Sequence, residues 1–206
     1  MRYYKGVNLM DTVTKKYIEN VQISDIPWHR LTTTYGRATD FPTELDVLWN
    51  MKDVGAIDVA GEELAQNIEH QSTLWHATPF ALIFLLRIFK KAVEEQGHNE
   101  IARYLVKELA ELFIIIAECI RDGLMLEHVD QLSNFEDMLN EEYLWSEEYD
   151  EDEDVLRYEE EEVFPDDLFF SFYYYSLQVL LLCKPLLDKN NKYEVTLLEL
   201  LTEIEN

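Results

Sequence analysis

Cysteine and basic residues are both scarce in this chain of 206 residues, and each shortage excludes a class of protein. Only Cys119 and Cys183 occur, too few for a disulfide framework or a zinc knuckle. Both lie in apolar stretches, so we expect reduced core thiols and a cytoplasmic protein. The 17 Lys and Arg residues face 42 Asp and Glu residues, which gives a net charge of −25. Because phosphates require cationic side chains, we expect a basic protein partner and no nucleic acid.

A long apolar stretch is missing as well. Residues 71–86 and 168–183 lack charge, but both contain polar side chains. Both are also shorter than the roughly 20 apolar residues that a membrane span needs. They are therefore predicted to be buried helices, and no membrane association is expected.

The hydrophobic spacing predicts an all-α chain, with helix ends marked by cap residues and by the few glycines and prolines. Thr78 followed by Pro79 is a strong helix start, and Gly97 and Gly123 are predicted to end helices. Thr43 is the expected cap of an early helix. The predicted helices are 43–51, 57–69, 79–96, 99–122, 165–186 and 194–204. Short connections between them favour antiparallel hairpins within a single domain, residues 1–206.

A string of turn, cap and packing residues fills the first third of this domain. It consists of Trp28, Leu31, Tyr35, Gly36, Ala38, Asp40, Pro42, His70, Gln71, Thr73, Trp75, Ala77 and Thr78. The string resembles the N-terminal block of bacterial HEAT-like helical-repeat proteins, many of them suspected immunity proteins of toxin systems. The resemblance implies stacked helical hairpins, an α-α superhelix, and a protein-binding function. Ser72 departs from the pattern, because the group usually has glycine there.

The charge of the chain is concentrated in an acidic insertion, residues 136–165. From Glu136 to Asp167 the sequence has 17 acidic residues and one basic residue, Arg157. Large aromatic residues alternate with the acids, and aromatic side chains commonly anchor protein interfaces while charge steers association. The predicted partner-binding residues are Tyr143, Trp145, Glu147, Glu148, Tyr149, Asp150, Asp152, Asp154 and Tyr158. The alternative is a solvated, flexible loop whose aromatic residues fold back on the domain.

Other kinds of site are less well supported by the sequence. Asp150, Asp152, Asp154 and Glu161 match the carboxylate positions of an EF-hand, but Val155 replaces the glycine that the loop requires. The five histidines show no metal-ligand spacing, and His70 with Gln71 is expected to fix a turn. The aromatic residues 169–175 are expected in the core, in contact with the acidic insertion, or else on an exposed strip. No cofactor, metal or catalytic residue is predicted.

The sequence therefore favours a non-enzymatic module that neutralises a basic toxin by occlusion, with carboxylates that imitate a phosphate backbone. Two alternatives remain: a structural or regulatory scaffold, and a hydrolase-type enzyme that uses carboxylates. An enzyme would need a concave cleft lined by titratable side chains.

Overall fold

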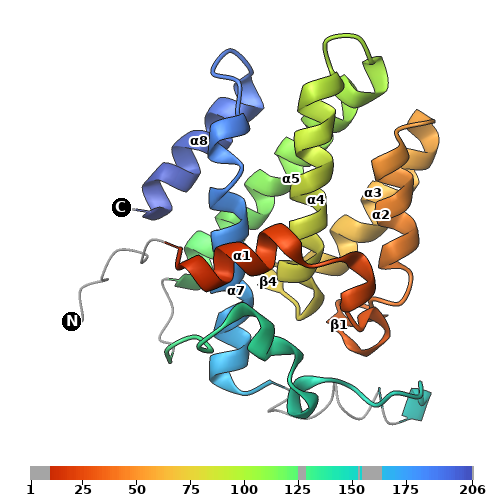
Figure 1. Cartoon of the computed structure of the whole chain (residues 1–206), viewed down its shortest axis with the longest axis vertical. Helices are drawn as coiled ribbons and strands as arrows, with labels where there is room; N and C mark the ends of the chain where they lie inside the picture. Colours follow the sequence, from red (N-terminus) through yellow and green to blue (C-terminus); the bar gives the residue numbers. More distant parts are fainter. Residues whose placement is uncertain (1–9, 125–128, 153, 155–163, 206) are drawn as a thin grey trace.

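Helices dominate the computed structural model, which describes residues 10–124, 129–152, 154 and 164–205 (Figure 1). The long helices are α2 (Phe41–Asn50), α3 (Val54–Ile68), α4 (Ala77–Glu95), α5 (Glu100–Leu124), α7 (Asp166–Leu181) and α8 (Lys192–Glu205). A shorter helix, α1 (Thr12–Asn20), crosses in front of α7 and α4 in Figure 1. The predicted all-α class is confirmed.

Helix α4 is the central element, because its side chains are buried on every side from Ala77 to Leu86. It packs against α2, α5 and α7, while α5 packs against α3 and α8. The pairs α2/α3 and α4/α5 are hairpins with short connections, and one buried cluster includes side chains from every described helix. The HEAT-like character of this stacking stays a prediction.

Side-chain caps explain several of the helix starts. The Asp11 carboxylate accepts hydrogen bonds from the backbone N–H groups of Val13 and Thr14 at the start of α1, a helix that the sequence analysis did not predict. Asn99 accepts from Ile101 and Ala102 at the start of α5. Such bonds satisfy N–H groups that have no partner within the helix.

Several predicted helix boundaries were wrong. Helix α3 begins at Val54, three residues before its predicted start, and α7 ends at Leu181, five residues before its predicted end. Thr43 does not cap α2, which begins at Phe41 with Asp40 at the cap position. Gly123 does not end α5, because the described helix continues through it to Leu124. A Cβ atom at Gly123 would lie 2.5 Å from two ring atoms of Tyr173 on α7. This glycine therefore serves the close approach of two helices rather than a helix exit.

Two small antiparallel hairpins were also not predicted. Strands β1 (Thr32–Thr33) and β2 (Gly36–Arg37) form the first, and β3 (Glu69–His70) and β4 (Thr73–Leu74) form the second. Gly36 has a φ of 137°, which explains the glycine at the first turn.

The aromatic residues 169–175 lie mainly in the core, as expected. Phe172 and Tyr175 are buried, and the Tyr175 ring lies 4.9 Å from the ring of Phe135, just ahead of the acidic insertion. Phe164, within the predicted insertion, packs edge-on against Phe172 at 5.3 Å. Both cysteines are buried free thiols. None of the described helices has the length and apolar content needed to cross a bilayer.

Candidate partner-binding surface

The part of the acidic insertion that the structure describes lies along one end of the helices, near β1 (Figure 1). We call residues 141–152 together with Asp154 the strap. We call residues 28–38, which contain the short 3-10 helix η2 (Trp28–Arg30) and the first hairpin, the block. The strap and the block are more than a hundred residues apart in sequence, yet they are joined by hydrogen bonds and ion pairs.

Arg30 makes the first junction. Its guanidinium donates to both oxygens of Glu141, at 3.0 and 2.6 Å, and its Nε donates to the carbonyl oxygen of Trp145. The Trp145 backbone N–H in turn donates to the Arg30 carbonyl oxygen at 3.1 Å. The strap backbone is thereby fixed at Trp145.

Arg37 makes the second junction, and it is buried. Its side chain is 5% exposed and the side chain of Asp154 is 8% exposed. Two parallel hydrogen bonds of 2.7 Å join the guanidinium to the Asp154 carboxylate, a bidentate geometry that suits arginine. The remaining N–H groups donate to the carbonyl oxygens of His29, Ser146 and Glu148.

Two aromatic rings of the strap complete the surroundings of this guanidinium. The centroids of Trp145 and Tyr149 lie 5.4 and 5.5 Å from its central carbon, within the range of a cation–π interaction. Arg37 is therefore enclosed by a carboxylate, three carbonyl oxygens and two rings. A buried cation needs such a set of partners to offset its desolvation.

The predicted partner-binding residues differ in how exposed they are in the structure. Trp145 is 2% exposed and Asp154 is buried, so both serve the internal contact, and their assignment to a partner surface is corrected. Tyr143 is half-buried. Glu147, Glu148, Tyr149, Asp150 and Asp152 are exposed, with Tyr149 at 67%. Tyr158 lies outside the described residues.

The two arginines that hold the strap were not predicted as site residues from the sequence. A signal existed, because Arg30 and Arg37 are the only Lys or Arg residues between Lys16 and Lys52. In a chain so rich in acids, two isolated cations within a turn-rich block are natural partners for the acidic segment. Hydrophobic periodicity, which predicts the helices, does not show which charged residues of distant segments pair.

The first hairpin, which belongs to the block, lies against the second hairpin. The Tyr35 hydroxyl lies 3.5 Å from Nδ1 of His70, and Thr33 donates to the Asn67 side chain at 2.9 Å. Gln71 and Ser72 occupy the second turn with positive φ values of 50° and 62°. His70 and Gln71 thus shape a turn, as expected, while Tyr35 is 66% exposed.

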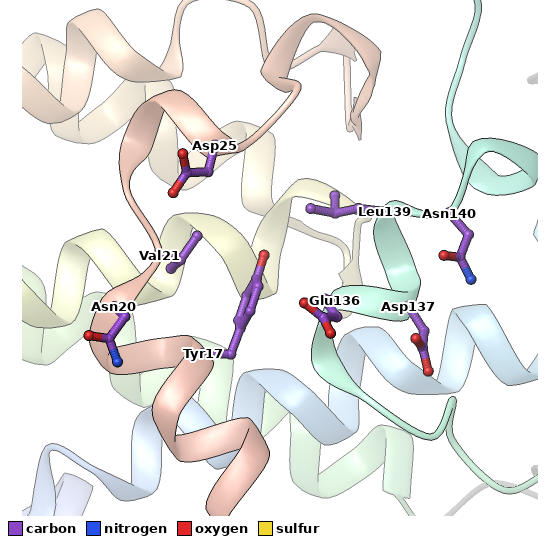
Figure 2. A pocket seen from close by; sticks show the side chains of 8 residues that line it. All are labelled: Tyr17, Asn20, Val21, Asp25, Glu136, Asp137, Leu139 and Asn140. Carbon is purple, nitrogen blue, oxygen red and sulfur yellow. The ribbon is translucent and has the colours of Figure 1, made fainter.

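A cleft of about 630 Å³ lies between the end of α1 and the 3-10 helix η3 (Phe135–Leu139) (Figure 2). Figure 2 shows the Tyr17 ring standing between its two walls, with Asp25 on one side and Glu136 and Asp137 on the other. Burial and the charges of Glu136 and Asp25 raise the pKa of Tyr17 above its ordinary value. The other residues that line the cleft are Asn20, Val21, Leu139 and Asn140.

Two of the three carboxylates in this cleft have a structural role. Asp25 accepts from the Gln22 backbone N–H at 2.8 Å, and Asp137 accepts from the Asn134 backbone N–H at 2.8 Å. Each bond closes the start of a 3-10 helix. The geometry is that of paired helix caps facing a shared opening.

One of the four carboxylates that matched the EF-hand pattern is not available to bind calcium in the structure. The Asp154 carboxylate is turned inward and binds Arg37. Asp150 and Asp152, by contrast, are exposed to solvent. Glu161 and Val155 are outside the described residues. Within the described ranges, no three His, Cys, Asp or Glu side chains are placed to hold a metal ion.

Comparison with known proteins adds no relative: no family model, curated protein or solved structure matches the chain.

Proposed function

We propose that this protein is a non-enzymatic, cytoplasmic binding module whose strap presents an acidic face to a basic protein partner. One observation carries the proposal: the strap is fastened to the domain by Arg30 and Arg37 while most of its carboxylates face solvent. Seven acidic residues of the strap are exposed, namely Glu141, Glu142, Glu147, Glu148, Asp150, Glu151 and Asp152.

Fixing these carboxylates in place has an energetic consequence. A disordered acidic segment loses conformational entropy when it binds, about 1–2 kcal/mol for each residue that becomes ordered. The strap is already ordered by its contacts with the block, so less is lost on association. Tyr149 adds a large exposed ring on the same segment, and tyrosine is a common anchor of protein interfaces.

The mode of action that fits this surface is occlusion. An array of carboxylates resembles a phosphate backbone in charge, so it would cover the substrate-binding surface of a basic toxin such as a nuclease. The long-range field of the chain, with a net charge of −25, would accelerate the encounter at low ionic strength. The immunity role itself rests on the resemblance of residues 28–78 to the N-terminal block of the HEAT-like group.

The test compares two variants with the same net charge. The strap variant carries Glu142→Gln, Glu148→Gln, Glu151→Gln and Asp152→Asn. The control carries Glu62→Gln, Glu63→Gln, Glu199→Gln and Glu203→Gln, four exposed acids on α3 and α8. Each tagged chain is used to capture a partner from the native host, and the association rate of the purified partner is then measured.

The expected partner is a basic protein. Its association with the strap variant should be at least tenfold slower than with the wild type at low salt. The association rate of the control variant should fall by a much smaller factor. Equal association rates for the strap variant and the control would contradict the proposal. So would a captured partner with an acidic surface.

A further inference from the structure

The strap and the block are joined by ion pairs, and Arg30 lies near two acids of the strap, Glu141 and Glu147. The block has three side chains able to carry positive charge, and each one contacts an acid of the strap. His29 lies 3.0 Å from Glu147, Arg30 binds Glu141, and Arg37 binds Asp154. These contacts form an intramolecular charge-paired interface between two segments that are distant in sequence.

The three pairs differ greatly in burial. Glu141 and Glu147 are 81% and 73% exposed in their pairs, and exposed pairs contribute little to stability because water and salt screen them. The Arg37–Asp154 pair is shielded on both sides. Removing one partner of a buried pair leaves the other charge without compensation, which is strongly unfavourable. Of the three ion pairs, Arg37–Asp154 therefore contributes most to holding the strap, beside the burial of Leu144 and Trp145.

The strap has little structure of its own to keep it in place. Among its described residues, regular structure consists of the 3-10 turn η4 (Glu141–Tyr143) and helical residues 151, 152 and 154, where the Asp154 N–H donates to the Asp150 carbonyl oxygen. Between these two points, the carbonyl oxygens of Trp145, Ser146 and Glu148 accept hydrogen bonds from the two arginines. A segment fixed in this way opens as one cooperative unit when its anchor is lost.

We propose that the strap is a conformational latch. The Arg37–Asp154 pair locks it closed, and it opens independently of the helical core. Opening uncovers the Trp145 indole and the Arg37 guanidinium, which no partner can reach in the closed form. This inference does not depend on the proposed function, because the carboxylates that would meet a basic partner are already exposed when the latch is closed.

Hydrogen exchange of the full chain tests the latch with two matched substitutions. Asp154→Asn and Glu141→Gln each replace a carboxylate by the amide of the same shape, and each carboxylate receives two hydrogen bonds from an arginine. They differ in burial. The readout is the exchange rate of backbone amides around Trp145, compared with the rate of amides in α4 and α5.

Asp154→Asn should accelerate exchange at Trp145 by about 100-fold or more, whereas Glu141→Gln should accelerate it less than about fivefold. The amides of α4 and α5 should keep wild-type rates in both variants. The proposal is overturned if both substitutions act equally, or if Asp154→Asn leaves exchange at Trp145 unchanged.

The wild-type chain supplies a test that needs no substitution. In increasing sub-denaturing urea, the strap amides should lose protection well before those of α4 and α5, since a separate unit has its own lower opening free energy. This measurement also tests whether the strap opens independently of the core if Asp154→Asn does not fold. Simultaneous loss of protection in the strap and the core would show that no independent latch exists.

Discussion

His76 is joined to Met138 by a hydrogen bond of 2.7 Å from its Nε2 to the Met138 carbonyl oxygen. The ring is fully buried and stacks on Phe172 at a centroid distance of 5.2 Å. Because a carbonyl oxygen only accepts, Nε2 must carry the proton. Burial lowers the pKa of His76 to about 4, so the imidazole is neutral at physiological pH. It ties the start of α4 to η3, the element that precedes the strap.

This burial predicts a loss of stability on mild acidification. In the unfolded chain the pKa of His76 returns to about 6.5, so the unfolded state binds a proton below this pH while the folded state does not. The stabilisation is complete above pH 6.5 and disappears progressively as the pH falls toward 4. Between pH 7.5 and 4.5 the free energy of unfolding should fall by about 2.5 kcal/mol through this residue.

Urea denaturation at the two pH values, on the wild type and on His76→Gln, isolates this contribution. A glutamine amide does not titrate, and it can still donate to the Met138 carbonyl oxygen. The carboxylates titrate in both chains, so the difference between the two pH-dependent losses reports His76. Equal losses would show that the imidazole is protonated in the folded state at pH 4.5.

Substitution of Gly123 should test the close contact between α5 and α7. Replacing glycine by alanine inside a helix ordinarily stabilises it by up to about 1 kcal/mol. At Gly123 the new methyl group would collide with the Tyr173 ring, so a net destabilisation of about 1–3 kcal/mol is expected. Gly61→Ala in α3 is the matched control, because nothing lies within 4 Å of its Cβ position. A stabilised Gly123→Ala variant would refute the contact.

The sequence predicted the helical framework because its signals are local. Thr78 followed by Pro79 marked the start of α4 to within two residues, and Asn99 does cap α5. Gly97 follows the end of α4, but without the left-handed backbone that favours glycine at helix ends. Cap chemistry and helical periodicity depend on neighbours a few residues away, which a sequence displays directly.

The candidate site could be predicted only in part, because its contacts join distant segments. The charge and aromatic content of the acidic insertion were visible in the sequence. The direction in which each side chain points was not, since Trp145 and Asp154 are turned inward by Arg37. Gly123 was misread for the same reason, because the ring that requires a glycine lies fifty residues away on α7.

The turn at Ser72 predicts a stabilising substitution. Ser72 adopts a φ of 62°, a backbone conformation that costs a non-glycine residue roughly 1–2 kcal/mol. Ser72→Gly should therefore raise the stability of the chain by about 0.5–1 kcal/mol once the added flexibility of the unfolded state is counted. Its backbone N–H keeps the 2.9 Å hydrogen bond to Glu69.

Ser72→Ala is the control for this prediction, because alanine retains the Cβ atom that causes the strain. Thermal unfolding followed by circular dichroism should rank the chains with Ser72→Gly highest and Ser72→Ala no more stable than the wild type. A glycine variant less stable than the alanine variant would show that the turn does not store this strain.

The two cysteines should be inert in the folded chain. Cys119 and Cys183 are 4% and 0% exposed, and burial raises the pKa of both thiols to about 12. Since the thiolate is the reactive form, a disulfide reagent at pH 8 should modify neither thiol at a measurable rate until the chain unfolds. The single substitutions Cys119→Ala and Cys183→Ala allow each remaining thiol to be followed alone. Modification of either native thiol at the rate of free glutathione would place that side chain at the surface rather than in the core.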